Sequence, residues 1–139
     1  MLNKPVGVVS ATTDTEHQTV IDLIDHPQSA SLHLAGRLDR SSSGLILLTN
    51  DGRWSERLMH PTQKVAKVYR VETRTPIPAS AVRAFERGFH FASEGIVTQP
   101  ANLEILNAHL ARVTIHEGRY HQIKRMFHRV DGIRLKSLH

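Results

Sequence analysis

The 139-residue sequence contains no cysteine. This absence excludes a disulfide scaffold, a thiol nucleophile, an iron–sulfur cluster and a cysteine-bound zinc site. No apolar run approaches the ~18 residues that a membrane span needs. The N-terminal segment MLNKPVGVVS is too polar, and its apolar part too short, for a secretory signal. We therefore expect a cytoplasmic chain without a membrane partner, folded as one domain with two lobes that bury their own core.

Recognisable metal motifs are also missing. The ten histidines show no HExxH or His–Cys spacing, so scattered surface histidines are a better interpretation than metal ligands. The sequence also has no glycine-rich loop that would cradle a phosphate group. We therefore predict no metal site.

What the chain does have is an excess of basic residues, with a formal net charge of +5. The excess is concentrated in residues 53–87, with eight basic and three acidic residues, and in 112–139, with seven and two. Thirteen of the 18 basic residues are arginine, which suits bidentate phosphate contacts. Two basic blocks favour a polyanionic partner, most simply a nucleic acid, although solvated charged faces are the alternative.

Apolar periodicity and turn residues predict strands and helices that do not alternate one for one. Strands are expected at 6–10, 32–35, 45–49, 64–73, 103–106, 110–115 and 134–138. Helices are expected at 19–24, 53–59, 78–87 and 120–130. The apolar run at 45–49 predicts a strand that is buried on both faces. Hairpins and segregated helices indicate an α+β fold with a mixed, mainly antiparallel sheet and flanking helices.

The expected helix at 120–130 has an apolar back and a basic front. At 100° per residue its apolar side chains fall within an arc of about 120°. They are Tyr120, Ile123, Met126, Phe127 and Val130. The basic side chains cover the rest of the helix, and Lys124 lies at the edge of the apolar stripe, where it could point into a cleft. An ordinary surface helix is the alternative interpretation.

Asp39 stands in a loop of small residues between Arg37 and Arg40, directly before an apolar strand. The two arginines favour the ionised carboxylate. An ionised aspartate held by a rigid strand can serve as a nucleophile or a base. A structural aspartate that caps a turn is the alternative, and loop physics alone leaves both interpretations open.

The segment 36–52, GRLDRSSSGLILLTNDG, closely resembles the catalytic motif of RNA pseudouridine synthases of the RsuA type, whose invariant aspartate corresponds to Asp39. Three further segments resemble motifs of that family, in the family's order. They are NKPVG at 3–7, KVYRV at 67–71 and EGRYHQIKRMF at 117–127. The resemblance covers essentially the whole chain and implies the fold of that catalytic domain, with two lobes around an active-site cleft.

The resemblance implies isomerisation of a uridine in RNA to pseudouridine, without a cofactor, after the base has been flipped out of its stack. It gives Asp39 the essential role, as a nucleophile or as a base that removes a ribose proton. Tyr69 is expected to stack on the uracil, Lys124 to pair with Asp39, and Leu138 to pack against the base, with Arg37 as further support. RNA contacts are expected from Lys4, Arg40, Lys67, Arg119, His121, Gln122, Arg125 and Arg129.

Within the family, the segments 52–55 and 118–127 are most similar to the enzyme that acts on small-subunit (16S) ribosomal RNA. The implied partner is therefore 16S ribosomal RNA or its precursor, bound by a monomer. The resemblance further implies that residues 1–139 form a catalytic domain that lacks the family's N-terminal RNA-binding module and its C-terminal end. A non-catalytic RNA-binding or ribosome-assembly factor on the same scaffold is the alternative. A metal-dependent nuclease is disfavoured because acidic residues are sparse around Asp39.

Overall fold

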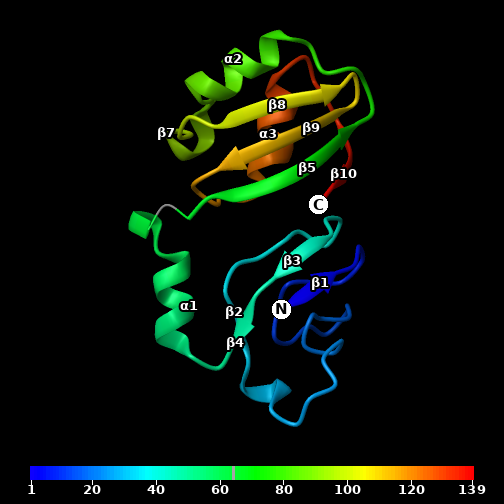
Figure 1. The fold of residues 1–139 in the computed structure, drawn as a ribbon, viewed down its shortest axis with the longest axis vertical. Coiled ribbons are helices and arrows are strands. Elements are labelled where there is room, and N and C mark those ends of the chain that lie inside the picture. The colour runs from blue at the N-terminus through cyan, green and yellow to red at the C-terminus, as the bar shows by residue number, and fades with distance from the viewer. Residues whose placement is uncertain (64) are drawn as a thin grey trace. The chain divides into compact units, whose positions relative to one another are not determined.

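The computed structural model describes residues 1–63 and 65–139 of the chain. The chain divides into two compact units, which we describe separately (Figure 1). The N-terminal unit comprises residues 1–63 and His139, and the sheet unit comprises residues 64–138. Helices and mainly antiparallel strands together confirm the predicted α+β class.

The sheet unit is built on four antiparallel strands in the order β10-β5-β9-β8. Their bounds are β5 Lys67–Thr73, β8 Asn102–Asn107, β9 Leu110–Ile115 and β10 Leu135–Leu138. The predicted hairpin of β8 and β9 and the predicted last strand are confirmed, while Lys64 lies outside the described residues. A small hairpin of β6 (His90–Phe91) and β7 (Ile96–Val97) was not expected from the sequence.

Two helices, α2 (Ser80–Arg87) and α3 (Gln122–Arg129), pack their apolar faces against the sheet. Phe85 of α2 lies at the centre of the core, with its ring centroid 5.0 Å from that of Phe127 and 5.3 Å from that of Phe89. Strand residues that face the helices are buried, whereas alternate residues such as Arg70 and Arg112 are exposed. The core therefore lies on one side of the sheet.

Helix α3 begins later than its sequence pattern predicts. The predicted stripe of Ile123, Met126, Phe127 and Val130 is buried, but Tyr120 is 76% exposed. The placement of Tyr120 in the stripe was wrong because the helix starts at Gln122, after His121 in a left-handed conformation with φ 46°. Tyr120 therefore lies before the helix and does not share its buried face.

The N-terminal unit contains two small antiparallel strand pairs, one α-helix and two short 3-10 helices. Strand β1 (Leu2–Lys4) pairs with β3 (Gly44–Ile46), and β2 (His33–Leu34) pairs with β4 (Leu48–Thr49). Helix α1 (Gly52–Met59) confirms the helix predicted at 53–59. The Asp51 carboxylate caps it by accepting hydrogen bonds from the backbone N–H groups of Arg53 and Trp54.

Three expectations for this unit were wrong. The predicted strand at 6–10 does not form: residues 6 and 7 make a turn with Gly7 at φ 95°, and only Val9 pairs, in a single parallel bridge with Thr19, because the pairing strand comes earlier, at Leu2–Lys4. The predicted helix at 19–24 is only a turn, in which the Asp22 carboxylate accepts from the backbone and hydroxyl of Thr19. The run at 45–49 is broken between β3 and β4, and Leu45 is 63% exposed because a two-stranded sheet covers only one face.

The described part of the chain holds no helix with the length and apolar character that a membrane crossing requires.

Candidate active site

Polar ties fix the backbone on both sides of Asp39. The Ser10 hydroxyl donates to the Leu38 carbonyl at 2.7 Å and accepts from the Leu38 N–H at 3.0 Å. The Gly7 N–H donates to the Arg40 carbonyl at 2.8 Å. Ser10 is buried and Asp39 is half-buried. The loop thus presents Asp39 from a backbone that is held at the residue before it and at the residue after it.

Lys4 is completely buried beneath this loop region, with 0% of its surface exposed. Its ammonium donates to the Pro5 carbonyl at 2.9 Å and to the Val8 carbonyl at 2.8 Å. Burial lowers the pKa of Lys4, and the nearby Asp39 carboxylate partly offsets this by raising it. The sequence predicts an RNA contact for Lys4, but the structure gives its side chain an internal role.

The other residues that flank Asp39 differ in exposure. Arg37 and Arg40 are exposed, as a contact with a polyanion requires. Ser42 is fully buried, and its backbone N–H donates to the Asp39 carbonyl at 2.9 Å. Gly44 follows with φ 126°, a conformation that favours glycine, and the chain then enters β3.

In the sheet unit, the predicted support residues Tyr69 and Leu138 lie on the neighbouring strands β5 and β10. Leu138 is opposite Val71, is 8% exposed and belongs to the apolar core. Tyr69 is half-buried, packs against the same core and shares its strand face with Lys67. One end of the β5–β10 pair therefore carries both predicted base-contacting residues.

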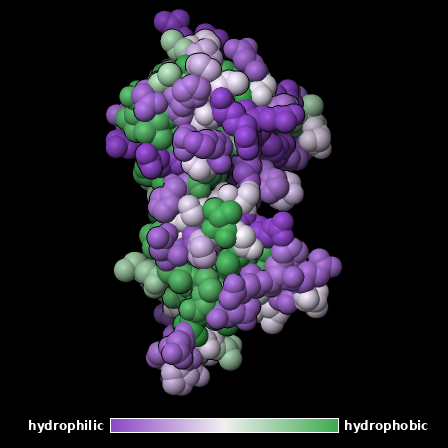
Figure 2. All heavy atoms as spheres, turned by 90° about the vertical axis from the view of Figure 1, so that its right-hand side faces the viewer, coloured by the Kyte–Doolittle hydropathy of each residue, from purple (hydrophilic) through white to green (hydrophobic). Residues whose placement is uncertain are grey.

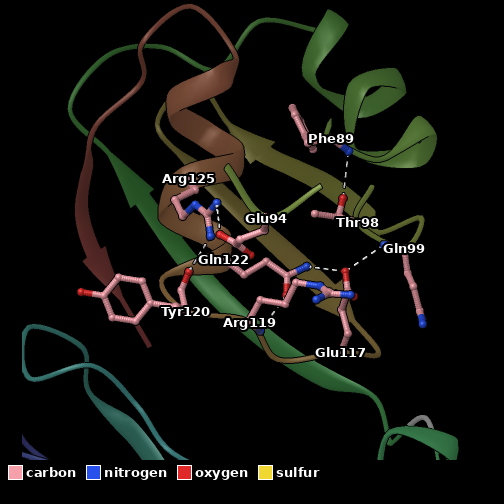
Figure 3. A network of polar contacts seen from close by, with 9 residues as sticks. All are labelled: Phe89, Glu94, Thr98, Gln99, Glu117, Arg119, Tyr120, Gln122 and Arg125. Atoms are coloured by element: carbon pink, nitrogen blue, oxygen red, sulfur yellow. Dashed lines mark hydrogen bonds and ion pairs between the residues drawn. The ribbon is translucent and has the colours of Figure 1, made fainter. Parts of the chain in front are cut away.

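The loop before α3 is organised by the carboxylate of Glu117 (Figure 3). One oxygen accepts from the Gln99 backbone N–H at 2.8 Å and from the Gln122 side chain at 2.7 Å. The other oxygen accepts from Arg119 Nε at 3.0 Å. This single carboxylate joins the segment before β8 to the first turn of α3. The start of the helix that carries Lys124 is therefore fixed by side-chain contacts.

Gln122 has both ends of its amide engaged in this loop. Its oxygen accepts from the Arg119 N–H at 3.0 Å, its nitrogen donates to Glu117, and only 4% of the residue is exposed. The sequence predicts that Gln122 and Arg119 contact RNA. The geometry assigns Gln122 to the loop instead, whereas Arg119, although it is paired with Glu117, keeps an exposed side chain.

Arg125 joins α3 to the β6–β7 hairpin. Its guanidinium lies 3.8 Å from the ring centroid of Phe91, forms an ion pair with Glu94 and donates to the Tyr120 carbonyl at 3.3 Å (Figure 3). Arg125, which the sequence predicts as an RNA contact, thus also holds the β6–β7 hairpin against α3. No sequence motif indicated Phe91 or Glu94, and the signal that could have found this hairpin is Gly95, which turns the chain between two short extended segments.

An open pocket of about 460 Å³ lies along the outer face of α3. Its walls come from that helix face and from the β6–β7 hairpin: Phe91, Ser93, His121, Lys124, Arg125, His128 and Arg129. At 100° per residue the four α3 residues among them, Lys124, Arg125, His128 and Arg129, share one face, opposite the buried stripe. Lys124, which the sequence places at the edge of the apolar stripe, therefore lines a hollow within the sheet unit.

Within residues 1–63 and 65–139, no group of three His, Asp or Glu side chains is arranged to hold a metal ion.

Comparison with known proteins decides the family. A sequence profile described as RNA pseudouridylate synthase matches residues 1–129. The chain belongs to this family. The chain is 53% identical over 132 residues to "Ribosomal small subunit pseudouridine synthase A" of Pseudomonas aeruginosa. That alignment covers 95% of this chain and 57% of the relative.

The protein of the same name from Escherichia coli is 43% identical over 139 residues, which are 100% of this chain and 60% of the relative. The chain thus spans about three fifths of the length of these relatives. A solved structure titled "Crystal structure of pseudouridylate synthase" superposes with a TM-score of 0.93 at 40% identity, covering 99% of this chain and 59% of that one. These findings confirm the resemblance that the four motifs indicate.

Proposed function

We propose that this chain isomerises a uridine of ribosomal RNA to pseudouridine. The bond between ribose carbon 1′ and uracil nitrogen 1 breaks, the uracil rotates, and carbon 5 bonds to carbon 1′. The proton on carbon 5 leaves and nitrogen 1 gains one, so the step needs no redox partner. The observation that carries the proposal is the family motif around Asp39, whose loop is fixed by Ser10 and Gly7.

The family's roles are carried to the matching residues of this chain. Asp39 attacks the nucleotide or removes a ribose proton. Tyr69 stacks on the uracil and helps to remove the proton from carbon 5, while Leu138 packs against the base. Lys124 supplies the active-site cation, and Arg37 supports Asp39 from the exposed side of its loop.

Binding of the RNA backbone is separate from the chemical step. A base inside stacked RNA must be flipped out, which costs a few kcal/mol. Contacts from basic side chains to the phosphate backbone supply binding energy that offsets this cost. Exposed Arg40, Arg119 and Arg129 and the pocket residue His121 are suited to this task, whereas buried Lys4 and Gln122 act by holding loops.

The proposed substrate is small-subunit ribosomal RNA, acted on by a monomer. The names of the Pseudomonas aeruginosa and Escherichia coli relatives, which specify the small ribosomal subunit, support this substrate. Primer-extension mapping of pseudouridine, in ribosomal RNA from cells with and without the gene, tests it directly. We expect one primer-extension stop, which marks pseudouridine in small-subunit ribosomal RNA, to be absent from cells without the gene. The stop should return when the wild-type gene is supplied, but not when the gene carries Asp39→Asn.

A matched control for that experiment is Asp25→Asn, which neutralises an exposed acidic residue of the same unit away from the Asp39 loop. It should restore the stop as the wild type does. Identical stops in both strains would refute the substrate assignment. Restoration by Asp39→Asn would leave the non-catalytic RNA-binding factor as the better account.

A further inference from the structure

A second pocket lies beside the first in the sheet unit. It measures about 400 Å³ and is lined by the end of α2, the segment after it and the end of α3: Ala84, Arg87, Gly88, Phe89, His90 and Arg129. Arg129 also lines the first pocket. The two pockets therefore share a wall, and the basic surface continues from α3 to the end of α2.

We propose that this second pocket binds a backbone phosphate of the RNA, at a nucleotide that flanks the one that reacts. The proposal rests on the proposed function, because it extends the path of the substrate RNA from the first pocket through Arg129 to Arg87 and His90. Neither Arg87 nor His90 stands within the four family motifs. The pocket thus adds a binding site outside the residues already considered.

The balance of charge in the second pocket favours an anion. Arg87 and Arg129 contribute two permanent positive charges, and the described lining residues include no acid. Both arginines lie in the last turn of a helix, where the helix dipole places roughly −0.5 elementary charge. Two full charges exceed two such half charges, so the pocket keeps a net positive potential. His90 adds to it when protonated.

The floor of this pocket is rigid. The Phe89 N–H donates to the Thr98 hydroxyl at 2.8 Å (Figure 3). The Thr98 N–H donates in turn to the Phe89 carbonyl at 2.9 Å. A Cβ atom on Gly88 would lie 2.3 Å from the Thr98 carbonyl oxygen, so only glycine fits there. A preformed pocket loses less entropy on binding a phosphate than a mobile one.

The same segment links the two pockets. Thr98 holds the floor of the second pocket, and the next residue, Gln99, is bound by Glu117 at the start of α3. From Gln122 to Arg129 the helix advances seven residues, or about 10 Å. A stacked strand rises about 3.4 Å per nucleotide. The basic surface is therefore long enough to contact the phosphates of several successive nucleotides.

The test measures how the full chain binds a fluorescent uridine oligonucleotide of about 12 nucleotides over a series of salt concentrations. Arg87→Gln removes one cation from the second pocket. We expect affinity near physiological salt to fall about three- to tenfold. We also expect the slope of log affinity against log salt to become shallower by about 0.7, the value for one lost single-strand phosphate contact.

The matched control is Arg70→Gln, which makes the same charge change on the exposed face of β5, on the side of the sheet away from the helices. It should bind as the wild type does. Equal affinities and slopes for the two variants would overturn the proposal. Arg87-dependent binding of polyglutamate that is tighter than binding of the oligonucleotide would also overturn it, in favour of an acidic protein.

Turnover of uridine-labelled ribosomal RNA by the wild-type chain is measured in the same preparation. Turnover without an Arg87 effect on binding would refute the second pocket alone. An Arg87 effect without turnover would support the pocket as an RNA site and refute the proposed isomerase.

Discussion

The N-terminal unit and the sheet unit are stabilised in different ways. The large apolar cluster lies entirely in the sheet unit. Among the described residues of the N-terminal unit, only Val8, Val20 and Ile46 are buried apolar side chains. That unit relies instead on side-chain ties such as those of Lys4 and Ser10. The unit that carries Asp39 is thus ordered mainly by polar contacts, and the proposed RNA-binding surface of the sheet unit lies over an apolar core.

The two units also differ in charge. The N-terminal unit has five basic and seven acidic residues, and the sheet unit has thirteen and six. On the face shown in Figure 2, more hydrophobic surface lies over the unit with β1–β4 than over the sheet unit. Because the N-terminal unit has more acidic than basic residues, the whole basic excess of the chain lies in the sheet unit. The difference in charge agrees with the proposed division of roles, in which the sheet unit attracts RNA and the N-terminal unit supplies the reactive carboxylate.

The largest expected effect on stability comes from the apolar core. Phe85→Ala empties a site that is 0% exposed, between the rings of Phe89 and Phe127. We expect the free energy of unfolding to fall by about 3–5 kcal/mol, measured by urea denaturation. A loss below about 1 kcal/mol would mean that the sheet unit does not depend on this core.

A smaller loss is expected from the polar ties. Ser10→Ala leaves the N–H and carbonyl groups of Leu38 without their partner, which costs about 1–3 kcal/mol in unfolding free energy. Because Leu38 adjoins Asp39, turnover should fall more than RNA affinity. The control Ser31→Ala removes an exposed hydroxyl bond to Gln28 and should change stability by less than about 0.5 kcal/mol. Equal effects of the two variants would contradict the special role of Ser10.

The smallest effect is a dependence on pH at the sheet edge. The hydrogen bond from Lys136 Nζ, at 2.9 Å, holds the pKa of Glu72 below its ordinary 4.5. Its contribution to stability is therefore present above pH 4.5 and is lost as pH falls through the lowered pKa. The stability difference between wild type and Glu72→Gln should be small at pH 7, because the pair is exposed, and should vanish in acid. A difference that grows in acid would contradict this sign.

The same contrast explains which elements the sequence could predict. In the sheet unit, the strand that became β5 and the apolar stripe of α3 from Ile123 to Val130 arise from burial against one core, so both were predicted correctly. In the N-terminal unit, the turn at Gly7 and the turn at Thr19–Asp22 depend on individual hydrogen bonds. Apolar periodicity does not report such bonds, and the strand and helix predicted there were wrong.

The candidate site divides in the same manner. Asp39 was indicated by its motif, and Lys124 was placed beside a hollow by the helical pattern. The sequence predicted Lys4 and Gln122 as RNA contacts, and both stand in segments that resemble motifs of the family. The structure buries both of them in internal hydrogen bonds. The sequence alone does not distinguish a polar residue that stabilises a loop from one that binds a ligand, because the two differ only in their hydrogen-bond partners.

The most direct test of this division of roles measures tritium released from carbon-5-labelled uridine in small-subunit ribosomal RNA, together with RNA affinity. For Asp39→Asn we predict no release above the enzyme-free background, with an affinity within about twofold of the wild type, because a half-buried carboxylate contributes little to phosphate binding. Release at the wild-type rate by Asp39→Asn would contradict the account.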